Sequence, residues 1–186
     1  SGTCTSPTSG GADNIGQTWS IPNVAKVKVG TEPKVAIVMG GGYDTCEDVD
    51  SPNPSCSSPK GNQVYVLDAD DGTVIKTFST LRSVMADVSV IDFDKDGYID
   101  YAYVGDTGGN LYRVAFSQYN ATTDTYTSLA SNKWTITRIA YTSGGTVVKN
   151  DGTSVSYKRK FQFAPAIFGV KGKVYVALGS GDRERP

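Results

Sequence analysis

Apolar residues along this chain occur in short runs, and each run is ended by Gly, Asp, Asn or Pro. The runs are rich in Val, Ile and Tyr, which favour strands, whereas the 3.6-residue periodicity of helices is almost absent. The pattern therefore predicts an all-β fold of short antiparallel strands joined by tight turns. The expected strands are Val35–Met39, Gln63–Asp68, Val74–Phe78, Val84–Ile91, Tyr101–Val104, Asn110–Phe116, Trp134–Ile139, Phe161–Phe168 and Lys173–Leu178.

Three segments repeat one pattern, a strand that runs into a glycine-rich turn. They are "PKVAIVMGGGYD" (33–44), "IDYAYVGDTGGN" (99–110) and "GKVYVALGSGDR" (172–183). Repetition of one supersecondary unit favours a β-propeller of four-stranded blades. We expect residues 1–186 to be part of one propeller domain, with two blades and the start of a third. Too few blades are visible to close a ring, so either the chain is truncated or other segments complete it.

Composition narrows the range of functions. The chain has no histidine, which removes the commonest general base and the commonest imidazole metal ligand, so a Ser-His-Asp triad is excluded. Lys plus Arg at 18 nearly balances Asp plus Glu at 19, which gives no global field toward nucleic acid. The longest apolar runs, such as 35–39, are much shorter than a membrane span. We expect a non-enzymatic protein with neither a nucleic-acid partner nor a membrane span.

The densest chemical motif is "DFDKDGYID", residues 92–100, with four carboxylates in nine residues. The D-x-D-x-D-G spacing resembles the first half of an EF-hand loop, in which carboxylates at alternating positions converge on calcium and glycine allows the sharp curl. An EF-hand requires Glu at position 12, where Tyr103 stands, so this is not an EF-hand. We predict a calcium-binding loop between two strands. The side-chain ligands are Asp92, Asp94, Asp96 and Asp100, and Tyr98 supplies its backbone carbonyl.

Electrostatics support an ion in this loop, because two carboxylates about 4 Å apart repel by about 4 kcal/mol at the effective dielectric near a protein surface. A solvated acidic turn with its aspartates splayed apart is the alternative. The second acidic stretch, "DADDG" at 68–72, has its glycine at the wrong place for calcium, and its Asp-Gly pair is typical of a hairpin turn.

The three cysteines indicate an oxidising compartment. Cys46 and Cys56 bracket a polar, proline-broken stretch inside the inserted loop 43–60, and we interpret them as a disulfide. Two free thiols in a mobile loop are the alternative. Cys4 is left over, which is compatible with a partner upstream in a longer natural chain. Because binding often resides in loops inserted into a rigid scaffold, loop 43–60 is a candidate partner-facing surface, although a plain solvent loop fits equally well.

The segments "GGGYD", "GNQVYVLDADDGTVIKTF", "DFDKDGYIDYAYVGDTGGNLYRVAF" and "APAIFGVKGKVYVALGSGDRERP" together resemble the C-terminal β-propeller of the PilY family of type IV pilus proteins. The resemblance runs from about Trp19 to the last residue. It implies a secreted protein at the bacterial cell surface, outer membrane or pilus tip, with roles in pilus assembly, retraction control and adhesion. It also implies Ca²⁺ in the loop 92–100, and as partners minor pilins or the pilus tip complex, host or abiotic surfaces, and the remainder of its own longer chain.

Two rival functions share parts of these patterns. "VYVLDADDGTVIKTF" also resembles the blade repeats of quinone-dependent dehydrogenases, but those enzymes hold calcium in the funnel of a complete ring, which this chain does not offer. An integrin-like adhesin or lectin propeller outside the pilus system shares the calcium loop and remains the other alternative.

Overall fold

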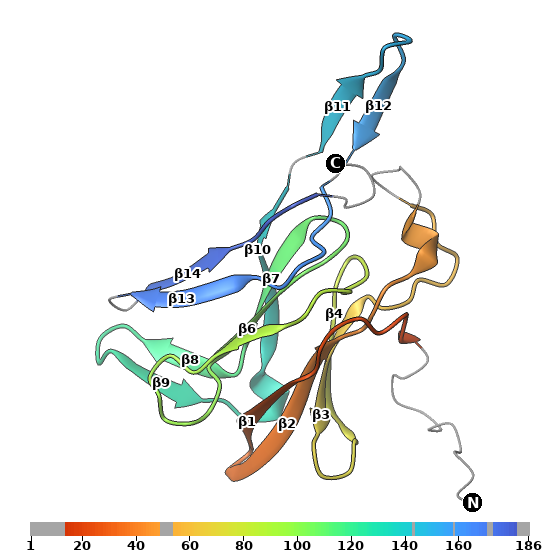
Figure 1. Cartoon of the computed structure of the whole chain (residues 1–186). Coiled ribbons are helices and arrows are strands. Elements are labelled where there is room, and N and C mark those ends of the chain that lie inside the picture. Colours follow the sequence, from red (N-terminus) through yellow and green to blue (C-terminus); the bar gives the residue numbers. More distant parts are fainter. Residues whose placement is uncertain (1–13, 49–53, 143, 158, 171–172, 182–186) are drawn as a thin grey trace, which may run out of the picture.

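Two four-stranded antiparallel sheets form the centre of the structure (Figure 1). The computed structural model describes residues 14–48, 54–142, 144–157, 159–170 and 173–181. The first sheet has the strand order β1-β2-β3-β4, with β1 (Asn23–Val29), β2 (Glu32–Gly40), β3 (Gln63–Asp68) and β4 (Val74–Ser79). The second has the order β10-β7-β6-β5, with β5 (Ser89–Ile91), β6 (Tyr101–Gly105), β7 (Asn110–Ala115) and β10 (Thr135–Tyr141).

Two-stranded sheets complete the described part of the chain. The hairpin of β8 (Ser117–Asn120) and β9 (Thr125–Ser128) is inserted between β7 and β10. The hairpin of β11 (Gly145–Val148) and β12 (Ser154–Tyr157) projects away from the sheets, and β13 (Ala166–Val170) pairs with β14 (Lys173–Ala177) (Figure 1). The described ranges also contain two short 3-10 helices, η2 (Thr45–Asp48) and η3 (Ser131–Lys133).

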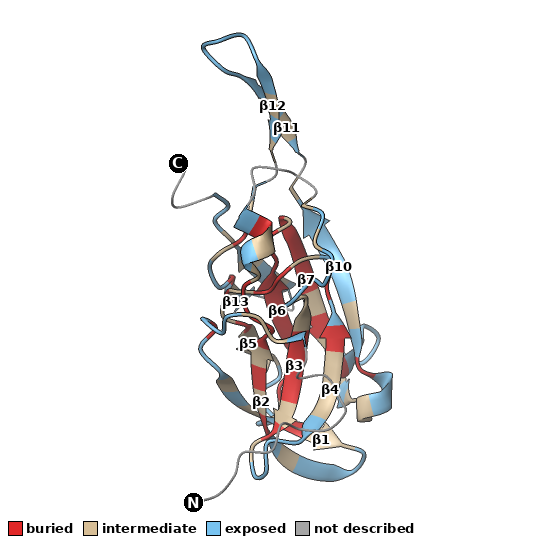
Figure 2. Ribbon diagram, turned by 90° about the vertical axis from the view of Figure 1, so that its right-hand side faces the viewer, coloured by how far each residue is buried: buried red, intermediate tan, exposed pale blue. Residues whose placement is uncertain are grey.

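The hydrophobic core lies between the two large sheets (Figure 2). Alternation places Ala36 and Val38 of β2 and Ala102 and Val104 of β6 in one buried cluster, because successive side chains of a strand point to opposite faces. All five residues of β6 are buried, so its second face is covered as well. This arrangement is the one expected when two propeller blades pack face to face.

Two of the predicted strands are wrong in extent. Only Ser89–Ile91 of the predicted strand 84–91 pairs as a strand; Val84 makes an isolated bridge to Gly42 instead. Val84 and Val88 are nevertheless fully buried, which explains why an apolar pattern extends beyond the ladder. The predicted strand 161–168 begins only at Ala166.

Within the described ranges, no helix has both the length and the apolar character needed to cross a membrane.

Candidate metal centre

The acidic loop 92–100 connects two neighbouring strands of the second sheet. β5 ends at Ile91 and β6 begins at Tyr101, and these two residues face each other in the antiparallel pair. The Asp100 N–H donates to the Ile91 carbonyl at 2.9 Å, which closes the neck of the loop. The loop is thus held at both ends by the sheet, without flanking helices in the described structure, as the sequence predicts.

The backbone of the loop curls through two left-handed residues, Lys95 with φ of 64° and Gly97 with φ of 92°. Glycine adopts this region without steric cost, and lysine does so only with strain. Carboxylates inside the curl accept backbone N–H groups: Asp92 Oδ2 from Gly97 (2.9 Å), Asp94 Oδ1 from Asp96 (3.2 Å) and Asp96 Oδ1 from Tyr98 (2.8 Å). These bonds fix the side chains of alternating residues against the backbone of the loop.

Three of the four predicted carboxylates gather at one point. One oxygen each from Asp92, Asp94 and Asp100 lies within 4.8 Å of the others. Asp94 is exposed, Asp92 is half-buried and Asp100 is buried, so the cluster opens to solvent on one side. Carboxylate oxygens suit a hard cation such as calcium, whose shell of six to eight oxygens can be completed by backbone carbonyls and water on the open side.

The other two predicted ligands are placed differently. Asp96 is not part of this three-carboxylate cluster; its Oδ2 lies 3.8 Å from Lys28 Nζ. Tyr98 is half-buried, and its ring lies under the Lys28 ammonium, with 4.2 Å between Nζ and the ring centroid. Their roles as ligands remain predictions.

The cluster carries negative charge that the chain neutralises only in part. Asp92 Oδ1 is buried and has no hydrogen-bond partner in the structure. Burial raises the pKa of the Asp100 carboxyl, and the nearby charge of Asp94 acts in the same direction. The Phe93 N–H, which donates to Asp100 Oδ2 at 2.7 Å, and the Ser117 hydroxyl lower it. A buried, unpartnered carboxylate oxygen beside two further carboxylates fits a bound cation.

The loop also touches two other parts of the fold through Phe93. The Phe93 ring lies 5.5 Å, centroid to centroid, from the ring of Tyr126 in the β8–β9 hairpin. It also covers Gly169 of β13 so closely that a Cβ there would lie 2.6 Å from the ring. The candidate site therefore sits where the second sheet, the β8–β9 hairpin and the β13–β14 pair meet.

Two residues at this site could not be found from the loop motif. Ser117, which hydrogen-bonds to Asp100, begins β8, and Lys28 belongs to β1 of the first sheet. Neither residue type at these positions carries a sequence signal for a metal site. Only the packing of the sheets brings them to the loop.

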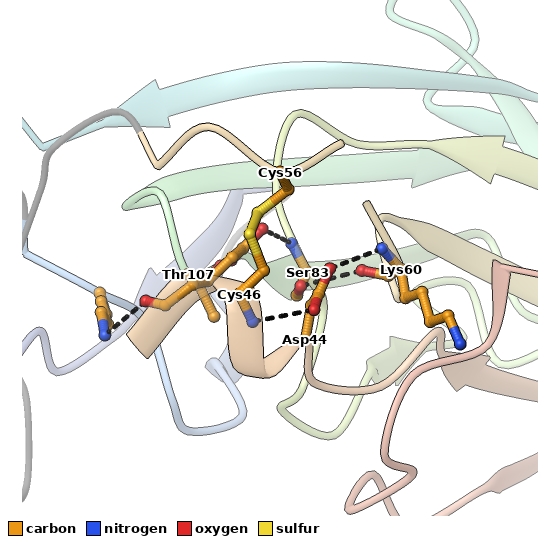
Figure 3. Close-up of a disulfide and its surroundings, with 8 residues drawn as sticks. Asp44, Cys46, Cys56, Lys60, Ser83 and Thr107 are labelled. Carbon is orange, nitrogen blue, oxygen red and sulfur yellow. Dashed lines mark hydrogen bonds between the residues drawn. A yellow bond between two sulfur atoms is a disulfide. The ribbon is translucent and has the colours of Figure 1, made fainter. Parts of the chain in front are cut away.

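The second predicted feature is the cysteine-bracketed loop, of which residues 49–53 lie outside the described residues. The structure joins Cys46 and Cys56 by a disulfide with 5.8 Å between the Cα atoms (Figure 3). Asp44 accepts the N–H groups of Cys46 (3.0 Å) and Lys60 (2.8 Å), so the two arms of the loop are also joined by hydrogen bonds. Cys4 lies outside the described residues.

Glu47, beside the disulfide, anchors this loop to the second sheet. Its carboxylate is buried, accepting the Ser83 N–H at 3.2 Å and the Thr107 hydroxyl (Figure 3). The Glu47 carbonyl also accepts Lys160 Nζ at 3.2 Å. The described arms of the loop are thus an integral part of the structure, which gives a partner-facing role no specific support.

Comparison with known proteins identifies the family. The sequence model of the protein family described as the PilY1 β-propeller domain matches residues 9–181. The chain belongs to the PilY1 β-propeller family. The predicted PilY resemblance is thereby confirmed.

This PilY1-family chain spans only part of the length of the two relatives it matches. It is 28% identical over 123 residues to a protein of Pseudomonas aeruginosa (strain UCBPP-PA14) named type IV pilus biogenesis factor PilY1, covering 62% of this chain and 9% of that relative. The crystal structure of the Pseudomonas aeruginosa PilY1 C-terminal domain matches with a TM-score of 0.59 and 21% identity, covering 91% of this chain and 33% of that one. The structural match confirms the predicted fold, a partial antiparallel propeller.

Proposed function

We propose that this chain is a calcium-binding β-propeller module of a type IV pilus biogenesis protein, located at the cell surface or pilus. The observation that carries the calcium assignment is the convergence of Asp92, Asp94 and Asp100, together with the buried Asp92 Oδ1, which has no hydrogen-bond partner. Family membership and the name of the Pseudomonas aeruginosa relative support the pilus assignment.

The residues of the loop divide into two roles in this proposal. Asp92, Asp94 and Asp100 hold the ion with carboxylate oxygens, while Asp96 and the Tyr98 carbonyl supply further oxygens as the shell closes. The ion supplies the positive charge that the cluster lacks. Because it binds the folded loop and not the unfolded chain, calcium about a hundredfold above its Kd adds about 2.7 kcal/mol of stability.

The contacts around the loop support a structural role for the ion. The loop contacts the first sheet through Lys28, the β8–β9 hairpin through Tyr126 and β13 through Gly169. Filling the loop with an ion therefore stiffens a junction of several elements. We propose that this junction supports contacts with minor pilins or the pilus tip complex, and through them assembly, retraction control and adhesion. The disulfide suits such a location.

The first test is isothermal titration of calcium into chelator-stripped protein. We expect heat with a stoichiometry near one, lost in Asp94→Asn, because Asp94 is exposed and its replacement leaves the fold intact. Asp71→Asn, in the other acidic turn, is the matched control and should titrate like the wild type. Absence of heat in a folded wild-type protein would refute calcium binding and leave the loop as an acidic turn.

The pilus assignment needs a separate measurement in cells. We expect Asp94→Asn in the full natural protein to lower the number of surface pili in calcium-containing medium, at unchanged protein level. Normal piliation in a strain whose purified variant binds no calcium would separate the pilus role from the ion.

A further inference from the structure

Lys28 reaches the calcium loop from the other large sheet. It lies on β1, whereas its partner Asp96 lies in the loop between β5 and β6. Lys28 Nζ is 3.8 Å from Asp96 Oδ2 and 4.2 Å from the centroid of the Tyr98 ring. The side chains of Lys28 and Asp96 are 33% and 41% exposed, so the pair is partly solvated and weak.

The backbone holds this cation at the loop. The Ile99 N–H donates to the Lys26 carbonyl at 3.0 Å, which joins the end of the loop to β1. Ile99 and its neighbour on β1, Val27, are both buried in the common core. Since β1 is joined to the end of the loop immediately before the Lys28 position, the ammonium group stays beside the loop.

Asp96 is the loop carboxylate that this cation draws away from the others. One of its oxygens accepts the Tyr98 N–H and the other faces Lys28, whereas Asp92, Asp94 and Asp100 converge on one point. The alternating spacing of the loop nevertheless places Asp96 among the side chains able to reach a central ion. Asp96 therefore has two competing cationic partners, the Lys28 ammonium and an ion in the loop.

We propose that Lys28 sets the calcium affinity of the loop, an inference that rests on the proposed calcium function. Its ammonium occupies Asp96 when no ion is bound and repels an entering divalent cation. Calcium binding then transfers Asp96 to the ion and releases the ion pair between the first and second sheets. Ion occupancy would thus be coupled to a contact between the two sheets.

The test is calcium titration of Lys28→Met, which keeps an apolar stem over Tyr98 and removes the charge. We expect its Kd to be about three- to tenfold lower than that of the wild type, because a competing and repelling charge is lost. The gain should shrink at high salt, which screens exposed charges. Lys28→Arg should restore the wild-type affinity, a rescue that a purely structural role for the lysine stem would not require.

Two controls make the result decisive. Lys76→Met, on β4, makes the same change of net charge away from the loop and should leave the Kd unchanged. Lys28→Gln gives a second neutral variant if methionine disturbs the strand. A Kd within twofold of wild type in both neutral variants, or an equal gain in Lys76→Met, would overturn the role of Lys28 while calcium binding stands. No calcium heat in the folded wild type would instead refute the proposed function itself.

Discussion

The turn 68–72 and the loop 92–100 are both rich in aspartate, and both connect neighbouring antiparallel strands, yet their charges are balanced in different ways. In the turn, Asp68 Oδ2 lies 2.5 Å from Lys34 Nζ, and Asp68 Oδ1 accepts the Asp70 N–H at 3.0 Å. Asp71 Oδ1 accepts both the N–H (2.9 Å) and the hydroxyl (2.7 Å) of Thr73. The chain itself thus supplies the partners of this turn.

The shifts in the aspartate pKa values show the same difference between the turn and the loop. The hydrogen bond from Lys34 holds the pKa of Asp68 below its usual value, and the Thr73 hydroxyl does so for Asp71. In the loop, burial raises the pKa of Asp100, and Asp92 Oδ1 is left without a partner. The number of aspartates therefore does not indicate a metal site. A site is indicated where carboxylates converge and one of their buried oxygens accepts no hydrogen bond from the chain.

The largest expected effect comes from removing one charge in each region. Asp92→Asn should abolish the calcium-linked stabilisation of about 2.7 kcal/mol at a hundredfold excess over Kd, whereas Asp71→Asn should retain it. In chelator, Asp92→Asn should cost little, because the amide oxygen can still accept the Gly97 N–H and a buried charge is gone. Denaturant unfolding with and without calcium measures all four values. Equal calcium effects in the two variants would remove the distinction.

A smaller effect is expected from the two glycines that allow these turns. Gly72 has φ of 75° and Gly97 has φ of 92°, and a Cβ added at either would meet no atom within 4 Å. Alanine should therefore cost about 1–2 kcal/mol at each position through backbone strain alone. Only Gly97→Ala should weaken calcium binding, because backbone strain at residue 97 displaces the N–H that holds Asp92 in place. Unfolding in chelator and calcium titration test the pair, and weaker binding in Gly72→Ala would contradict the assignment.

Much of the fold was predictable where the two-residue alternation coincides with burial. β3 has the predicted bounds because its apolar run, Val64 to Val66, is buried on both faces of a central strand. β1 was missed because its longest apolar run is only two residues, although Ala25, Val27 and Val29 alternate with Lys26 and Lys28. The inserted hairpins β8–β9 and β11–β12 were missed because they are largely polar and exposed. A continuous apolar run therefore reveals the buried central strands, and it misses an edge strand such as β1 and these exposed hairpins.

The candidate site was predictable in its local part only. The curl of the loop and the convergence of its aspartates follow from their spacing and from the position of the glycine, because these features act within nine residues. The position of Asp96 was not predictable, since it depends on a lysine of the other sheet. Likewise, the charge of Asp68 in the turn 68–72 is balanced by Lys34, which lies outside the hairpin motif.

The smallest expected effect is a pH dependence of stability that arises from the Lys34–Asp68 ion pair of the turn 68–72. Lys34 lowers the pKa of Asp68, so the folded carboxylate is favoured over the unfolded one. The stability from this pair is therefore fully present above the unfolded pKa of about 4 and is lost as the pH falls through the lower folded value. Lys34 has a raised pKa, so on the alkaline side the same stability is lost only as the pH rises through that folded value.

Asp68→Asn and Lys34→Met should each flatten the acid part of this profile, and the double variant should add nothing further, because both remove one pair. Denaturant unfolding between pH 5 and pH 2.5 in chelator measures the slopes, with Lys76→Met as the control that keeps the wild-type slope. If Asp68→Asn lost stability in parallel with the wild type, Lys34 would not be the partner that satisfies the turn. The contrast with the loop would then have to rest on Thr73 and the backbone N–H groups alone.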